Sequence, residues 1–322
     1  MHHVWRVILR EGLLAASLGF GELTLLGRLN RSCRRLHDAA WRAIWRERSK
    51  TCGSAELGRM LRLAVTWGKA AHVRELVAQQ GDASVLLQAL NDEPSILFLA
   101  VKEGHVEVVR ALLEVGGREM VMKTRDNGVS CLMTSAFWGH LEVSKALLKA
   151  GGRELAMMTT DDGVSCLHNS AQEGHVDVVN ALLEVGGLEL AMLTMDDGAS
   201  CLYVSAKNGH VDVVNALLEV GGLELAMLTR DDGASCLYVS AENGHVDVVN
   251  ALLEVGRLEL AMLTAGDGGS CLCISAENGH LEVVNALLEA GGRELVMLAR
   301  DDGGSCLMTR FAELLKSPYA AV

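Results

Sequence analysis

The sequence predicts an all-α protein in which similar helical units stack into an open solenoid. A block of 35 residues recurs along most of the 322-residue chain, and each copy carries the dipeptide Gly-His at the same register. The dipeptide stands at 104–105, 139–140, 174–175, 209–210, 244–245 and 279–280. Such fixed spacing indicates stacked repeats, each of which buries its apolar face only against its neighbours. A stack of this kind presents a long surface, so binding is the first functional hypothesis.

Each unit begins with a predicted turn and a short helix, and residues 196–230 show the pattern most clearly. Asp197 and the glycine after it favour a turn. Ser200 stands directly before an apolar stretch and is therefore a suitable N-cap for a helix over about 201–208. Gly209 is expected to end that helix.

A second helix is predicted over about 211–219 of the same unit. It is apolar on more than one side, which suits a helix that packs against neighbours in both directions. Gly221 and Gly222 are expected to stop it. The segment 223–229 is compatible either with an extended finger or with a short extra helical turn, because Glu, Leu, Ala and Met favour helix.

The order of these residues resembles the ankyrin repeat. The family motif D-G-x-T-P-L-H-x-A-A-x-x-G-H-x-x-V-V-x-x-L-L aligns with residues 162–183, which read DGVSCLHNSAQEGHVDVVNALL. Ser165 stands at the threonine of the motif, Cys166 at the proline and His168 at the histidine, which other units replace by Met, Tyr or Cys. The unit is longer than the family's usual ~33 residues, and the added residues lie in the connector. The resemblance implies helix pairs joined by short connector fingers, and a protein or peptide bound through a concave face.

The chain is expected to consist of four parts. They are a basic helical element at 1–54, a divergent capping repeat at 55–90, six ankyrin-like repeats at 91–300 and a partial C-terminal repeat or cap at 301–322. Residues 1–50 hold ten Lys/Arg and four Asp/Glu, a net charge of +6. Because the whole chain has a net charge of −12, the remaining residues carry −18. This compositional break indicates a separate N-terminal element before an acidic array.

Residues 7–48 resemble the latter part of an F-box, whose pattern is several spaced leucines followed by a tryptophan. The candidate adaptor-binding residues are Leu23, Leu26, Leu29, Leu36 and Trp41. The resemblance implies a substrate-recognition subunit of a ubiquitin ligase, in which this element binds the ligase adaptor. The alternative is a basic helical cap that covers the first repeat.

The cysteines that recur once per unit are interpreted as structural. Stacking separates equivalent positions by ~8–10 Å, which exceeds the ~7 Å that a disulfide spans. We therefore expect small buried residues with free thiols, as is typical of a reducing compartment. These cysteines are Cys131, Cys166, Cys201, Cys236, Cys271 and Cys306.

No motif in the sequence predicts catalysis. The Gly-His histidines and the paired aspartates of the turns lack the close spacing of metal sites, and no nucleophile elbow, phosphate loop or H-E-x-x-H motif occurs. We expect a protein that is not an enzyme, with no catalytic residue, metal ligand or cofactor.

The candidate partner-binding residues are the two positions before the last five Gly-His pairs, which differ between units while the framework does not. They are Phe137, Trp138, Gln172, Glu173, Lys207, Asn208, Glu242, Asn243, Glu277 and Asn278. The aromatic pair is the leading candidate, since exposed aromatic anchors carry much of the energy of protein interfaces. The alternative is that one of the two rings packs under the preceding divergent repeat.

Composition restricts the partner and the location. An acidic array should repel nucleic acid and favour a basic protein or peptide. No uncharged apolar stretch approaches the ~20 residues of a membrane-spanning helix, and the N-terminus does not have the pattern of a secretory signal peptide. We expect a soluble monomer in the cytoplasm or the nucleus, without membrane contact.

Overall fold

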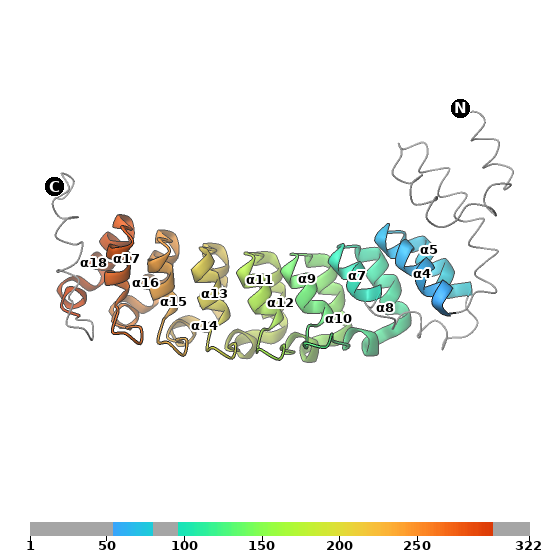
Figure 1. The fold of residues 1–322 in the computed structure, drawn as a ribbon, viewed down its shortest axis with the longest axis horizontal. Helices are drawn as coiled ribbons and strands as arrows, with labels where there is room; N and C mark the ends of the chain where they lie inside the picture. Colours follow the sequence, from blue (N-terminus) through green and yellow to red (C-terminus); the bar gives the residue numbers. More distant parts are fainter. Residues whose placement is uncertain (1–53, 80–95, 299–322) are drawn as a thin grey trace, which may run out of the picture. The chain divides into compact units, whose positions relative to one another are not determined.

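The computed structural model describes residues 54–79 and 96–298, and all regular elements in these ranges are α-helices (Figure 1). The chain divides between Gly117 and Arg118 into two compact units. The predicted F-box-like residues lie outside the described ranges.

The described part of the first unit is made of short α-helices. Its helices are α4 (Ser54–Thr66), α5 (Ala70–Gln79), α7 (Ile96–Lys102) and the larger part of α8 (Val106–Val121). Leu57, Leu61 and Leu76 form part of its buried core. Gly68 has a φ of +63°, and a Cβ at this position would lie 3.0 Å from the ring of His105. A histidine of one hairpin therefore lies against the glycine turn of the other.

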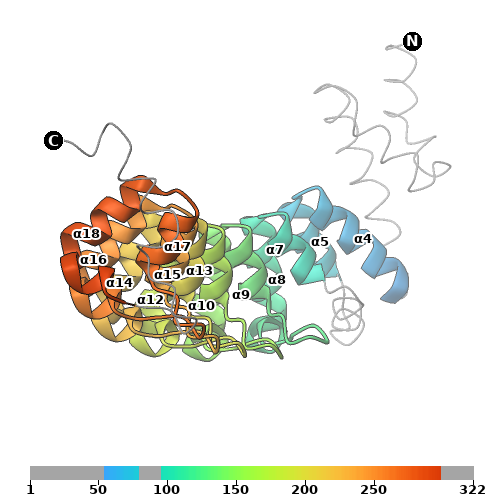
Figure 2. The same cartoon turned by 60° about the vertical axis from the view of Figure 1, so that its left-hand side comes forward.

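The second unit is a row of stacked helix pairs, which confirms the predicted all-α repeat architecture (Figure 1). The first helix of each pair is α9 (Cys131–Phe137), α11 (Cys166–Gln172), α13 (Cys201–Asn208), α15 (Cys236–Glu242) or α17 (Cys271–Glu277). The second is α10 (Leu141–Ala156), α12 (Val176–Ala191), α14 (Val211–Ala226), α16 (Val246–Ala261) or α18 (Leu281–Val296). Helices of each kind contact their counterparts in the next pair, so two continuous rows form, and Figure 2 shows the second helices side by side.

The first helices begin and end where local chemistry predicts. The hydroxyl of Ser200 accepts a hydrogen bond of 3.1 Å from the backbone N–H of Tyr203, and Ser200 itself has extended backbone, as an N-cap requires. Gly209 ends the helix with a φ of 77°. Serines at the same register cap the other first helices, namely Ser130, Ser165, Ser235 and Ser270.

The connector combines both alternatives that the sequence left open. In α14 the second glycine, Gly222, has a φ of 50° and a ψ of −143°, which kinks the helix, and one further helical turn follows to Ala226. The chain then forms a short finger that is closed by a single antiparallel bridge between Thr229 and Ser235. The residues that make this unit longer than the family's usual repeat therefore lie in a segment that is partly helical.

The repeated cysteine holds the end of the extra turn. The thiol of Cys201 donates to the carbonyl of Ala191 over 3.3 Å, and Cys166, Cys236 and Cys271 make the equivalent contact. These thiols and Cys131 are buried and free, as predicted. Burial raises the pKa of Cys166, Cys201, Cys236 and Cys271 to about 12, so they remain protonated and unreactive near neutral pH.

Cys273 and Cys306 differ from these cysteines. Cys273, two positions after Cys271, is disulfide-bonded, which the prediction of free thiols did not include. Cys306 lies outside the described residues.

One kink carries a residue other than glycine. Arg257 occupies the position of Gly222 in the next unit, with a φ of 37° and a ψ of −126°. An L-residue in the left-handed region costs about 1–2 kcal/mol. Arg257 is the only described residue besides glycine with a positive φ. This unit therefore has a strained arginine at the position where the other units have a glycine.

Candidate binding surface

The predicted binding residues lie at the C-terminal ends of the first helices and in the turns that follow. Every one of them is exposed except Glu277, which is half-buried. Phe137 is 38% exposed and Trp138 is 48% exposed. Their rings meet edge to face with the centroids 5.5 Å apart, so the two form one aromatic patch on the surface.

The backbone of these positions belongs to the framework. The Nε2–H of His175 donates to the carbonyl of Phe137 over 3.1 Å. His210, His245 and His280 make the same contact with the carbonyls of Gln172, Lys207 and Glu242. These four histidines thus join neighbouring units, in agreement with the interpretation of the Gly-His histidines as structural residues, and only the side chains of the binding positions remain for a partner.

The second candidate position is further constrained in three units. Asn208 donates from its side chain to the carbonyl of Val204 over 3.0 Å, and Asn243 and Asn278 also bond to backbone carbonyls. A partner would have to break or share these bonds. The aromatic, acidic and lysine side chains at the other positions are therefore the stronger candidates.

The finger tips carry the paired aspartates, and the two members of a pair have different roles. Oδ1 of Asp197 accepts from the N–H of Ala199 over 3.1 Å, which closes the turn. The N–H of Asp231 donates to the carbonyl of Asp197 over 3.0 Å, so adjacent fingers are also joined. The first aspartates of the pairs, Asp161, Asp196 and Asp231, are exposed, and these carboxylates form an acidic rail along the finger tips.

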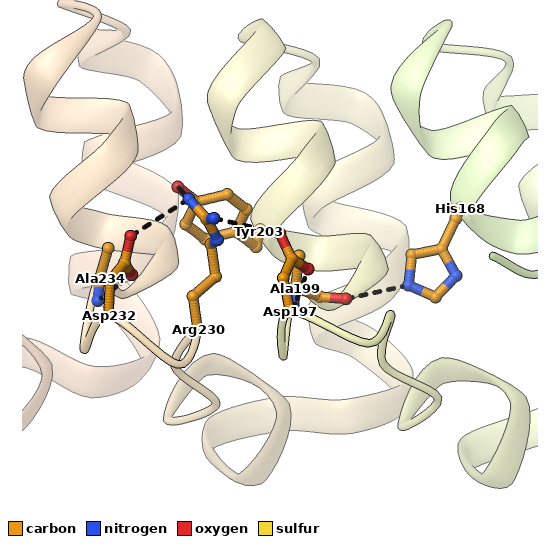
Figure 3. A network of polar contacts seen from close by, with 7 residues as sticks. All are labelled: His168, Asp197, Ala199, Tyr203, Arg230, Asp232 and Ala234. Atoms are coloured by element: carbon orange, nitrogen blue, oxygen red, sulfur yellow. Dashed lines mark hydrogen bonds and ion pairs between the residues drawn. The ribbon is translucent and has the colours of Figure 1, made fainter. Parts of the chain in front are cut away.

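Arg230 pairs with the second aspartates of two fingers, a feature that the sequence did not predict. Its guanidinium lies 3.1 Å from a carboxylate oxygen of Asp197 and 3.3 Å from one of Asp232, which belong to two successive fingers (Figure 3). It also donates to the hydroxyl of Tyr203 over 3.4 Å and stacks 5.4 Å from the centre of that ring. The cluster fixes two fingers and one first helix relative to one another, and it reduces the negative charge locally.

The pKa values in this cluster follow its packing. Burial raises the pKa of Tyr203, against the opposing effect of Arg230. The hydrogen bond from Arg230 to Tyr203 raises the pKa of the guanidinium in turn. The phenol stays neutral and the guanidinium stays charged at physiological pH. The sequence signal was weak, because arginine also stands at this register in two other units, whereas the remaining units have Thr160, Met195 and Ala265.

His168 occupies the register of Tyr203 one unit earlier, and it is buried (Figure 3). Its Nδ1 accepts from the hydroxyl of Ser165 over 2.8 Å, and its Nε2–H donates to the carbonyl of Ala199 over 3.2 Å. Burial lowers its pKa to about 4. A neutral ring with both nitrogens engaged ties the first helix to the next finger.

The described residues contain no group of three or more His, Cys, Asp or Glu side chains placed to hold a metal ion. In the same part of the chain, no helix combines the length and the apolar character that crossing a bilayer requires.

Comparison with known proteins agrees with this architecture. The family described as Ankyrin repeats (3 copies) matches residues 61–156, 152–226 and 221–297, more than half of the chain. The crystal structure of the human ASB11 ankyrin repeat domain is similar over 66% of this chain and 89% of that chain, with a TM-score of 0.50 and 26% sequence identity. A search of curated proteins finds no match. The tandem helix pairs, the Gly-His contacts between them and these matches together show that the chain belongs to the ankyrin repeat family.

Proposed function

We propose that the second unit is a non-enzymatic scaffold that binds a protein or peptide along the ends of its first helices and its fingers. Ankyrin repeats are generally protein-interaction modules. The observation that carries the proposal is the exposed pair Phe137 and Trp138. Aromatic residues make up only 4% of this chain, so two adjacent exposed rings are a strong candidate for an interface anchor.

The charge of the same surface supports a basic partner. The acidic rail of Asp161, Asp196 and Asp231 lies on the finger tips, while Glu173 and Glu242 are exposed at the ends of first helices. Complementary charge accelerates encounter and selects against acidic competitors. An extended basic segment with an apolar residue for the aromatic patch fits this arrangement best.

Replacing Trp138 by alanine is expected to weaken partner binding about tenfold or more, because an exposed aromatic anchor typically contributes on this scale. Proteins captured from a lysate by the intact chain and by the variant are to be compared by quantitative mass spectrometry. Since the side chain is 48% exposed, the melting temperature should stay almost unchanged.

The matched control is Leu281→Ala, a residue 41% exposed at the start of α18. Partners retained by this control and lost with Trp138→Ala support the proposal. A marked fall in the melting temperature of Trp138→Ala would instead assign the tryptophan a packing role.

The second candidate function is a ubiquitin-ligase substrate receptor, which rests on the F-box resemblance of residues 7–48. The adaptor should then be recovered with the intact chain and lost on deletion of residues 1–55. Equal recovery with both would assign the N-terminal element a role other than adaptor binding.

A further inference from the structure

A second surface, formed by the second helices, has properties that the proposed function does not use. The leucine stripe comprises Leu188, Val220, Leu223, Val255 and Leu258, which lie at the kinks of α12, α14 and α16. Leu188 is 42% exposed, Val220 is 38% exposed and Val255 is 39% exposed. Leu223 and Leu258 are half-buried. Figure 2 shows these helices as neighbours in one row.

The stripe is continuous from unit to unit. The Cδ1 of Leu223 lies 3.2 Å from where a Cβ of Gly256 would stand, directly after Val255, and Leu258 approaches Gly291 to the same distance. Leu188 has the same register one unit earlier. Leu223 and Leu258 are therefore directed toward the kink of the following unit, and their apolar contacts extend along the row.

In the two preceding units, an arginine stands at the position that these leucines occupy. Arg118 forms an ion pair with Glu154, and Arg153 forms one with Glu189, in each case 36 residues later in the chain. At the next positions of the series Leu188, Leu223 and Leu258 replace the arginine.

The corresponding carboxylates lose their partner as a result. Glu224, Glu259 and Glu294 are exposed, and the described residues include no basic side chain paired with any of them. The earlier units show that a guanidinium at this place binds the carboxylate 36 residues further on.

Further negative charge lines the same stripe. Glu219 and Glu254 are exposed one residue before Val220 and Val255. Arg257, directly before Leu258, places a cation beside the stripe, and it lies at the strained kink of α16. The surface thus combines apolar area with a clear excess of carboxylates, and such a surface selects a partner that is apolar and cationic at once.

We propose that the leucine stripe binds an amphipathic helix of a partner protein that presents leucines flanked by arginines. The partner's apolar residues cover Leu188, Leu223 and Leu258, and its arginines take the places that arginine holds in the preceding units. Stacked helices are ~8–10 Å apart, and seven residues of a helix rise ~10.5 Å. Arginines seven residues apart therefore match carboxylates on successive units. This surface lies on the second helices and is independent of the aromatic patch.

A direct binding measurement tests the proposal. The probe is a synthetic amphipathic helix with leucines on one side and an arginine at every seventh position, titrated onto the intact chain by fluorescence anisotropy. The variant Leu188→Arg/Leu223→Arg/Leu258→Arg places arginines at the positions that Arg118 and Arg153 hold in the preceding units. There each arginine can pair with the carboxylate 36 residues later, as Arg118 and Arg153 do. We expect it to bind the probe about tenfold more weakly or worse.

A second variant keeps the test decisive if the arginine variant does not fold. Glu224→Gln/Glu259→Gln/Glu294→Gln removes only the carboxylates and should also weaken binding. The control Asp177→Asn/Asp212→Asn/Asp247→Asn makes the same change in net charge at exposed positions in the first turns of α12, α14 and α16. It should bind the probe like the natural chain.

Selective loss with the first two variants supports a site at the leucine stripe. Equal weakening in all three variants shows general attraction of a cation to an acidic protein and overturns the proposal, as does unchanged binding in the arginine and glutamine variants.

Discussion

Replacing Gly209 by alanine is expected to destabilise the second unit by about 3 kcal/mol. Gly209 has a φ of +77°, and a Cβ there would lie 2.7 Å from Nδ1 of His245. The ring cannot move away without loss, because its Nε2 is hydrogen-bonded to the carbonyl of Lys207 over 3.0 Å. Left-handed strain contributes about 1 kcal/mol, and overpacking against a fixed side chain contributes about 2 kcal/mol. Urea unfolding followed by circular dichroism measures the loss.

The chain offers a matched control for this substitution. Gly279 has a φ of +79°, but nothing among the described residues lies within 4 Å of its Cβ position. Gly279→Ala should therefore show only the backbone strain, about 1 kcal/mol. Adding His245→Ala to Gly209→Ala should relieve the clash. If the two substitutions lower the free energy of unfolding equally, contact with the histidine ring is not the reason that position 209 requires glycine.

Acid is expected to destabilise the protein through His168, by about 3 kcal/mol at the limit. Its pKa is about 4 in the folded chain, against an ordinary value of 6.5, and one unit of pKa corresponds to about 1.4 kcal/mol. Because the folded state favours the neutral ring, its contribution is complete above pH 6.5. It is lost progressively as the pH falls to about 4, since the unfolded chain takes up the proton first.

His168→Tyr isolates this contribution, because Tyr203 occupies the same register in the next unit. Unfolding free energies of the natural chain and the variant are to be measured from pH 7 to pH 4. The difference between them should shift by about 2–3 kcal/mol in favour of the variant over this range, since the other titrating groups are common to both. Parallel pH profiles would assign the acid sensitivity to other residues.

The ends of the first helices could be predicted from sequence because they depend on local chemistry. Ser200 and Gly209 act within a few residues of themselves, through a hydroxyl that bonds to the next turn and a backbone that accepts positive φ. The histidines of the Gly-His pairs were also interpreted correctly as structural. Their partner carbonyls lie 38 residues away, but the strict repeat implies that equivalent residues meet when units stack.

The connector and the polar cluster could not be predicted in the same way. The segment after Gly222 contains residues that favour helix, yet its finger is closed by Thr229 and Ser235 and by contact with the next finger. Arg230 meets Asp197 and Tyr203 only because two successive fingers and one first helix converge there. The direction of a long side chain depends on the packing around it, which local propensity does not describe.

The sequence by itself determined the family, the period and the helix pair, because capping, helix-stopping glycines and apolar periodicity act over a few residues and recur in every unit. It also indicated positions before Gly-His at which units differ, and all of the named ones except Glu277 are exposed. Only the tertiary structure decided which repeated residues join the units, which carboxylates are neutralised by Arg230, and where the leucine stripe replaces an ion pair. These features depend on side chains from different units that approach within a few ångströms, and stacking alone brings them together.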